Sequence, residues 1–386
     1  MVQNESHNYD YIFAGTGLAA LMTVYKMVQL PFFAQKTILL LDEQPKDSND
    51  RTWCFWSTEP TQWEPSVSKH WDVAHFGCQS FDRDLVLSPY QYQMIRGIDF
   101  YQQVLSSLRQ HSNVTFVSEK VVAIEETEQQ IFVKTNQTVY YGKRLFNSIY
   151  HPELVAKQQK YPVLQQHFIG WVVQTKEAVF IPEKPTFMDF SVAQKDNTRF
   201  MYVLPTTAHQ ALVEYTLFSS QLLPKQEYEA EIQKYLAQLG VTDYTIIEKE
   251  QGSIPMTSYP FWKWNTKNVL HIGTAGGWTK ASTGYTFKNA DKKSEALVAF
   301  LQNEQPFTLF GKRNKFWWYD LLLLDILHRN NAIGSHIFSK LFQKGTPSLI
   351  FKFLDEDTTL IEDLQVIWKC PKMPFIKALF RVLLYR

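Results

Sequence analysis

One acidic side chain stands alone in an apolar stretch of the sequence. Glu214 is the only charged residue between Ala211 and Phe218. If this stretch is a β-strand, Leu212 and Thr216 share the face of Glu214. The opposite face then carries Val213, Tyr215 and Leu217. Burying an unpaired carboxylate costs several kcal/mol, so the pKa should be raised, which makes Glu214 a candidate general acid. The alternative is an edge-strand glutamate that points to water.

A glycine turn near the N-terminus has the pattern of a dinucleotide-binding fingerprint. Residues 15–20 read Gly-Thr-Gly-Leu-Ala-Ala, between an apolar strand and an apolar helix. The expected cofactor contacts in this turn are Gly15, Gly17, Leu18, Ala19 and Ala20. Asp42 ends the next strand and stands 22 positions after Ala20, near the spacing at which an acidic residue bonds the ribose hydroxyl. The alternative is a structural glycine turn without a ligand.

A second glycine-rich segment far along the chain favours FAD over a nicotinamide. A short strand runs into a glycine loop, and a further loop follows just before another helix. The residues of these loops that we expect to contact the cofactor are Gly273, Gly276, Gly277, Thr283 and Gly284. Flavoproteins use such a late loop to cover the pyrophosphate and the flavin ring. The first turn alone cannot distinguish FAD from a nicotinamide, because both cofactors use the same backbone geometry there. The alternative is a plain surface loop.

The elements that must position these residues form two sets. A strand over Tyr9–Ala14, a helix from Leu18 to Val28 and a strand over Lys36–Asp42 make one βαβ unit. A helix over 99–110, short strands at 114–116, 121–124 and 130–134, and a strand over 268–273 complete this part. Strands at 168–175, 187–190, 199–204 and 211–218, with a helix over 226–239, indicate a second, mostly antiparallel domain.

Composition narrows the class of protein. The 39 Lys and Arg nearly cancel the 38 Asp and Glu, so no global field attracts nucleic acid. Aromatic residues are abundant, which suits a large apolar ligand or a thick core. The three cysteines are too few for a disulfide framework or a metal site, and neither a signal peptide nor a bilayer-spanning segment is recognisable. We therefore expect a cytoplasmic protein without a metal.

Taken together, several segments resemble the bacterial lycopene beta-cyclase family. Together with the first turn and the segment around Glu214, these segments have the order and spacing of that family along nearly the whole chain. These segments are 50–56, 168–171, 187–190, 252–257 and 273–285.

The resemblance implies an FAD-dependent enzyme that closes the ends of a linear carotene such as lycopene. It implies that Glu214 protonates the substrate and that the FAD is reduced, with NAD(P)H as the reductant, but is not consumed. It also implies that Arg51 lies near the flavin and Trp53 near the substrate. Aromatic residues could face a carbocation, although each of them, taken alone, fits a place in the core better. These are Trp171, Trp278 and Tyr285.

Two departures from the family pattern concern this site. Tyr215 stands where relatives often have a second acid next to the first. Residues 146–150 lack the Asp and Arg that many relatives carry after a strand. The first departure suggests that one carboxylate suffices in this motif.

We expect an α/β fold with a Rossmann-like FAD domain (1–50, 91–160 and 265–306), an interleaved mixed-sheet substrate domain (51–90 and 161–264) and a helical C-terminal region (307–386). The basic amphipathic segment Phe375–Arg386 could lie on a bilayer, so that the protein is peripheral on the cytoplasmic membrane, or it could pack on the core. Two other functions stay open: a redox flavoenzyme acting on an isoprenoid, and a carotenoid carrier without catalysis.

Overall fold

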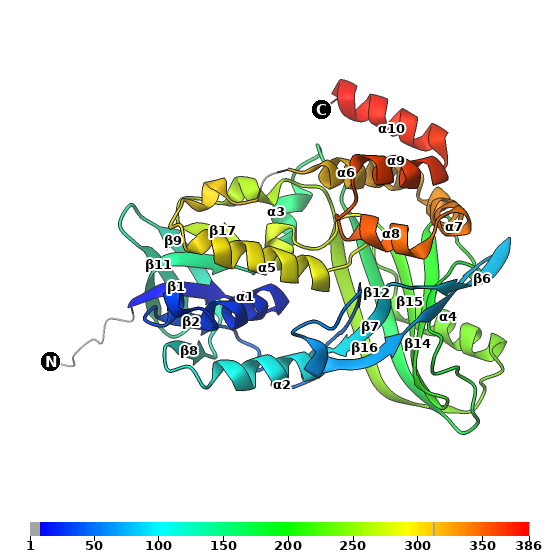
Figure 1. Ribbon diagram of the computed structural model, residues 1–386, viewed down its shortest axis with the longest axis horizontal. Coiled ribbons are helices and arrows are strands. Elements are labelled where there is room, and N and C mark those ends of the chain that lie inside the picture. Colours follow the sequence, from blue (N-terminus) through cyan, green and yellow to red (C-terminus); the bar gives the residue numbers. More distant parts are fainter. Residues whose placement is uncertain (1–7, 312, 386) are drawn as a thin grey trace.

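The computed structural model describes residues 8–311 and 313–385 and contains two large sheets and a helical C-terminal region (Figure 1). The first sheet has the order β8-β2-β1-β11-β10-β9, with β17 beside β11, and all its pairings are parallel except those of β9 and β10. Its strands are β1 (Asn8–Ala14), β2 (Ile38–Leu41), β8 (Val114–Val117), β9 (Val121–Glu126), β10 (Ile131–Thr135), β11 (Val139–Asn147) and β17 (Val269–His271).

The strands of this sheet are apolar on both sides, and helices cover one of its faces. All four residues of β2 are buried, as expected of a central parallel strand. The covering helices are α1 (Leu18–Val28), α2 (Gly97–Leu108) and α5 (Phe287–Leu301). The predicted βαβ unit is therefore confirmed, and β17 returns late in the chain to lie beside β11.

The second sheet has the order β16-β12-β15-β14-β13-β5-β6 and is largely antiparallel. Its strands are β5 (Val73–Cys78), β6 (Phe81–Val86), β12 (Leu164–Thr175), β13 (Thr186–Asp189), β14 (Thr198–Thr207), β15 (Gln210–Ser219) and β16 (Tyr244–Met256). A small third sheet contains β3 (Thr52–Ser57), β7 (Gln91–Arg96) and β4 (Val67–Trp71). Strand β16 is not among the strands expected from the sequence, although it flanks the strand β12 over that strand's whole length.

Helices lie on both faces of the second sheet. Helix α4 (Lys225–Gln238) packs on one face, and the C-terminal helices pack on the other (Figure 1). The helices of the C-terminal region are α6 (Lys315–Arg329), α7 (Gly334–Lys344), α8 (Pro347–Leu354), α9 (Leu360–Lys369) and α10 (Lys372–Tyr385); a short α3 (Pro152–Ala156) follows β11. The expected α/β class with a helical C-terminal region is confirmed. Among the described residues, no helix has both the length and the apolarity needed to cross a bilayer.

Candidate active site

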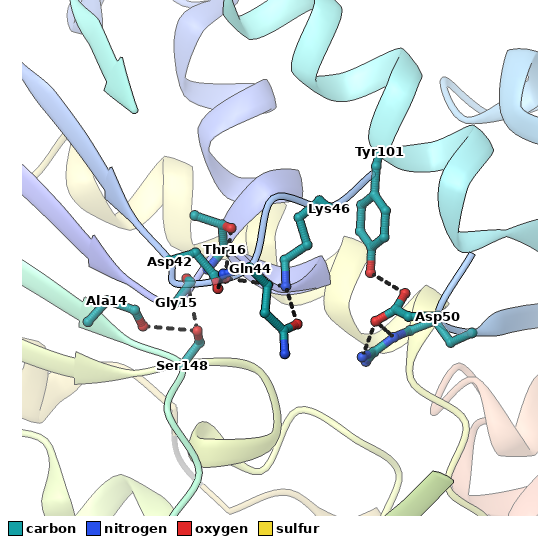
Figure 2. Close-up of polar contacts among 10 residues, drawn as sticks. Ala14, Gly15, Thr16, Asp42, Gln44, Lys46, Asp50, Tyr101 and Ser148 are labelled. Carbon is teal, nitrogen blue, oxygen red and sulfur yellow. Dashed lines mark hydrogen bonds and ion pairs between the residues drawn. The ribbon is translucent and has the colours of Figure 1, made fainter. Parts of the chain in front are cut away.

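The first glycine turn is held by hydrogen bonds from three segments. Gly15 has φ +87°, a conformation that favours glycine, and its N–H donates to the Leu41 carbonyl over 2.8 Å. Ser148 Oγ, at the end of β11, donates to the carbonyls of Ala14 (3.0 Å) and Gly15 (2.9 Å) (Figure 2). A Cβ atom at Gly15 would collide with this hydroxyl. Ser148 belongs to the segment that departs from the family pattern, and its role here is to fix the turn.

The N-terminus of α1 is open to a ligand. Gly17 is its N-cap residue and makes no side-chain capping bond, and a Cβ atom placed there would have no atom within 4 Å. Gly17, Leu18 and Ala19 line a cavity, whereas Ala20 is buried against the sheet. Free N–H groups and the helix dipole at such an end attract a phosphate. The turn therefore fits the pyrophosphate of a dinucleotide.

Asp42 binds the turn itself. It accepts hydrogen bonds from the Thr16 N–H (2.7 Å) and Thr16 Oγ1 (2.8 Å), and its carboxylate lies 3.3 Å from Lys46 Nζ (Figure 2). The Gln44 N–H donates to its other oxygen over 2.9 Å. The contact of Asp42 with a ribose hydroxyl stays a prediction.

The late glycine loop meets the first turn. A Cβ atom on Gly273 would lie 3.4 Å from that of Ala19, and Gly273, Thr283 and Gly284 line the same cavity as the turn. Gly276 and Gly277 do not line it. They shape the loop instead, because a Cβ atom at Gly276 would strike the His271 carbonyl and Gly277 has φ +65°.

One cavity of about 480 Å³ joins both glycine loops to Glu214. This size lies within the range of small-molecule sites. Its walls come from the loops that follow strands of the first sheet, from the small third sheet and from the second sheet. The second sheet contributes Gln166, Phe168, Tyr202, Leu204, Leu212, Glu214, Glu250 and Gly252 to the lining.

Glu214 lies in the middle of the second sheet. Its strand β15 pairs with β12 on one side and β14 on the other, so the edge-strand alternative does not hold. The side chain is 8% exposed and accepts a 2.5 Å hydrogen bond from Thr216 Oγ1, on the face predicted for it. Burial, followed by the charge of Glu250, raises the pKa of Glu214 well above its ordinary value.

Glu250 on β16 is the partner that the sequence analysis does not identify. Glu214 and Glu250 are both paired with Gly170 of β12, so the two carboxyl groups lie on the same face of the sheet with no side chain between them. The two carboxyl groups share a hydrogen bond, and Thr52 Oγ1 donates to Glu250 over 2.8 Å. Burial raises the pKa of Glu250 to about 7, although the bonds from Thr52 and Glu214 oppose the shift.

Gly170 makes this arrangement possible. A Cβ atom there would lie 2.9 Å from a methyl carbon of Leu212 and 3.1 Å from Cγ of Glu250. A larger residue would push Glu250 away from Glu214. The glycine therefore provides the space in which the two acids meet.

The remaining predicted site residues divide into two groups. Arg51, Trp53 and Tyr285 line the cavity, and the Arg51 guanidinium forms a 2.6 Å ion pair with Asp50. The hydroxyl of Tyr285 lies 3.5 Å from that of Tyr202, which is paired with Glu214 across β14 and β15.

The structure does not bring Trp171 and Trp278 to the cavity. Trp171 is paired with Val213, and therefore lies on the opposite face of the sheet from Glu214, in the core beneath α4. Trp278 is buried in the core of the first domain, where its ring contacts Phe310. Both residues therefore belong to the hydrophobic core, which was the alternative to a place beside the substrate.

The departure at Tyr215 also has a structural reason. Tyr215 points to the same far face as Trp171, where its hydroxyl accepts a 3.2 Å hydrogen bond from Arg199. An acid at this position of β15 would face away from the cavity. The partner of Glu214 must come from another strand, and β16 supplies it.

Within the described ranges, no cluster of three or more His, Cys, Asp or Glu could hold a metal ion.

Known proteins resemble this chain in sequence. The sequence model of the family described as "Lycopene cyclase protein" matches residues 10–380. The lycopene beta-cyclase of Pantoea ananas is 25% identical over 395 aligned positions, which cover 96% of this chain and 97% of that protein. The lycopene beta-cyclase of a Paracoccus species is 27% identical over a segment that covers 34% of this chain and 35% of its own.

Solved structures share the fold at low identity. A geranylgeranyl bacteriochlorophyll reductase-like protein of Thermoplasma acidophilum has a TM-score of 0.60 at 12% identity, covering 98% of this chain and 100% of its own. A halogenase PltM variant in complex with FAD has a TM-score of 0.59 at 12% identity, covering 92% of this chain and 83% of its own. The fold is thus that of flavoproteins, and the match along nearly the whole sequence shows that this chain belongs to the lycopene cyclase family.

Proposed function

We propose that this protein is a lycopene beta-cyclase, which converts linear lycopene to gamma-carotene and beta-carotene by acid–base ring closure without net oxidation. The observation that supports it most directly is Glu214, a buried carboxyl group with a raised pKa that shares one cavity with both glycine loops. A general acid that keeps its proton near neutral pH suits protonation of an alkene.

The proposed reaction begins with the proton of Glu214. Its transfer to the terminal double bond of the polyene leaves a tertiary carbocation. The neighbouring internal double bond attacks this cation and closes the ring, and loss of a proton from the ring restores a double bond. The rings of Tyr202 and Tyr285 line the cavity beside Glu214, where an aromatic face can stabilise the passing positive charge.

The cofactor of this reaction is proposed to be reduced FAD, with NAD(P)H as its reductant. The open N-terminus of α1 and the late loop at Gly273, Thr283 and Gly284 would hold its phosphates and ring. Reduced FAD would supply an electron-rich ring that stabilises positive charge in the cavity without being consumed.

The substitution Gly17→Val tests the cofactor site. The new side chain would extend into the space kept open at the N-terminus of α1, so we expect FAD affinity to fall by about tenfold or more. The measurement is flavin retained after purification, together with a binding titration. Thermal unfolding without flavin should match the wild type, because no neighbouring atom is displaced. Undiminished affinity for FAD would place the pyrophosphate elsewhere.

A membrane-facing surface is proposed on the last two helices, because a carotene is dissolved in lipid. In α10, Ala378 and Val382 pack on the protein and Arg381 forms an ion pair with Asp325 over 2.6 Å, so part of the predicted tail belongs to the core. The other face is apolar and exposed, as is much of α9 at the same edge of the molecule (Figure 1). The exposed residues are Leu360, Ile361, Leu364, Ile367, Trp368, Met373, Ile376, Leu379, Phe380, Leu383 and Leu384.

Liposome binding tests this surface. We expect the double variant Phe380→Glu, Leu383→Glu to move from the liposome pellet to the supernatant, because two carboxylates would have to enter the lipid interface. The matched control is Val86→Glu, Val122→Glu, which places the same charges at exposed apolar positions on β6 and β9. These point variants leave the packed face of α10 intact. If both double variants sediment with the liposomes to the same extent, α10 is not part of the membrane contact.

The fold keeps a second function open, because its structural relatives include a reductase-like protein and halogenases. A redox flavoenzyme would oxidise its flavin once for each product. The carrier without catalysis is less well supported, since binding a hydrocarbon gives no reason to bury two carboxyl groups beside it.

A further inference from the structure

The pairing of Glu214 with Glu250 has a consequence for the chemistry of the site. The two residues come from strands β15 and β16, which are separated by β12, and they meet across Gly170 of that strand. Each side chain is 8% exposed. Two buried carboxyl groups in hydrogen-bond contact cannot both ionise without strong repulsion.

We propose that Glu214 and Glu250 hold one proton between them, and that Glu250 acts as a positioning residue which keeps this proton on Glu214, facing the substrate. The inference rests on the proposed function for its catalytic meaning, while the shared proton itself is a property of the folded protein alone.

The hydrogen bonds of the pair decide which residue keeps the proton. Glu250 accepts a second hydrogen bond from Thr52 Oγ1, which favours its ionised form. Of the nearby charges, that of Glu248 opposes ionisation of Glu250 and the cation of Arg51 favours it. Thr216 donates a hydrogen bond to Glu214, and the charge on Glu250 opposes the ionisation of Glu214. The proton therefore stays on Glu214, which donates to Glu250.

Four further titratable groups near the pair stay neutral near neutral pH. Burial raises the pKa of Cys54 on β3 to about 12. Burial likewise raises the pKa values of Tyr92 on β7, Tyr202 on β14 and Tyr285 before α5. Glu250 thus supplies the charge that acts on Glu214, whereas Glu250 itself is also influenced by the charges of Glu248 and Arg51.

The proton that the pair gives up in the reaction is later returned to it. When the O–H bond of Glu214 breaks, the less substituted carbon of the terminal double bond gains the proton, the other carbon becomes a tertiary cation, and the pair becomes doubly negative. The double negative charge, unfavourable by itself, is then compensated by the carbocation beside it. After ring closure, the C–H bond of the ring breaks and its proton returns to the pair. No oxidant or reductant is needed.

The first test is the pH profile of Glu250→Gln. Without the neighbouring charge, Glu214 should lose its proton more readily, so the alkaline limb of kcat should move to lower pH while KM stays unchanged. Glu250→Asp should restore part of the wild-type profile. The matched control is Glu119→Gln, a glutamate outside the cavity that also accepts hydrogen bonds from hydroxyl groups, those of Thr135 and Tyr140. An alkaline limb of Glu250→Gln that coincides with the wild type would overturn the inference.

The second test needs neither substrate nor activity. Infrared difference spectra of wild type against Glu214→Gln should show the C=O band of a protonated carboxyl group at neutral pH, and in Glu250→Gln this band should disappear at a lower pH. If Glu250→Gln does not fold, the band in the wild type and its loss in Glu214→Gln still test whether the pair holds a proton. A missing band would overturn the shared proton. A band in a protein that forms no rings would support the pair and contradict the proposed function instead.

Discussion

Replacing Glu214 by glutamine should lower the rate of ring formation by about 10²–10⁴-fold, the usual contribution of a general acid. Glutamine has nearly the same shape and still accepts the hydrogen bond from Thr216, but its amide has no proton acidic enough to protonate an alkene. The loss should appear in kcat, because the carboxyl group acts on the reacting carbon, whereas binding of the polyene depends on the apolar walls of the cavity. Product formed by purified enzyme with pre-reduced FAD is the measurement.

Two controls separate this effect from misfolding. Glu214→Gln should retain FAD like the wild type, because the hydrogen bonds of the Glu214 side chain go to Thr216 and Glu250 and not to the glycine loops. It should also be more stable than the wild type at alkaline pH. A glutamate whose folded pKa is raised stabilises the protein fully below its unfolded pKa and loses that contribution as the pH rises through the folded value. A fully active variant would mean that another group protonates the substrate.

The sequence predicts the parts of this site that depend on local pattern. The turn at Gly15 and Gly17 is readable because the tight strand-to-helix turn needs glycine at fixed spacing. Glu214 is readable because a lone charge interrupts an apolar strand, and the structure confirms both its burial and its face.

The partner of Glu214 is not readable in the same way. Glu250 stands in a stretch with Glu248 and Lys249, which by pattern resembles a solvent-exposed strand. Only the register of β16 on β12, set by contacts between distant segments, brings Glu250 opposite Gly170. The three consecutive charged residues 248–250 do not reveal which strand lies beside them.

The aromatic residues show the same limit. Trp171 and Gly170 are neighbours in sequence, yet successive residues of a strand point to opposite faces, so one lies at the cavity and the other beneath α4. The family resemblance draws attention to the segment that holds both. It does not say which residue of the pair faces the substrate.

The isotopic composition of the product should separate the cyclase from a redox flavoenzyme. Ring closure begins with one proton gained and ends with one lost, so lycopene and its cyclic products are isomers. In heavy water the acidic proton of Glu214 exchanges with solvent. We therefore expect each new ring to keep about one deuterium, because the proton later lost leaves from a different carbon.

Such an experiment, run without oxygen and with pre-reduced FAD, also follows the flavin. In the proposed chemistry every electron pair that moves stays within the polyene, and the proton comes from and returns to the carboxyl pair of Glu214 and Glu250. The absorbance of the reduced flavin should therefore persist through many turnovers, and Glu214→Gln should incorporate deuterium only as slowly as it forms rings. A reductase would instead oxidise its flavin in step with product, and product without solvent deuterium would rule out protonation by an exchangeable acid such as Glu214.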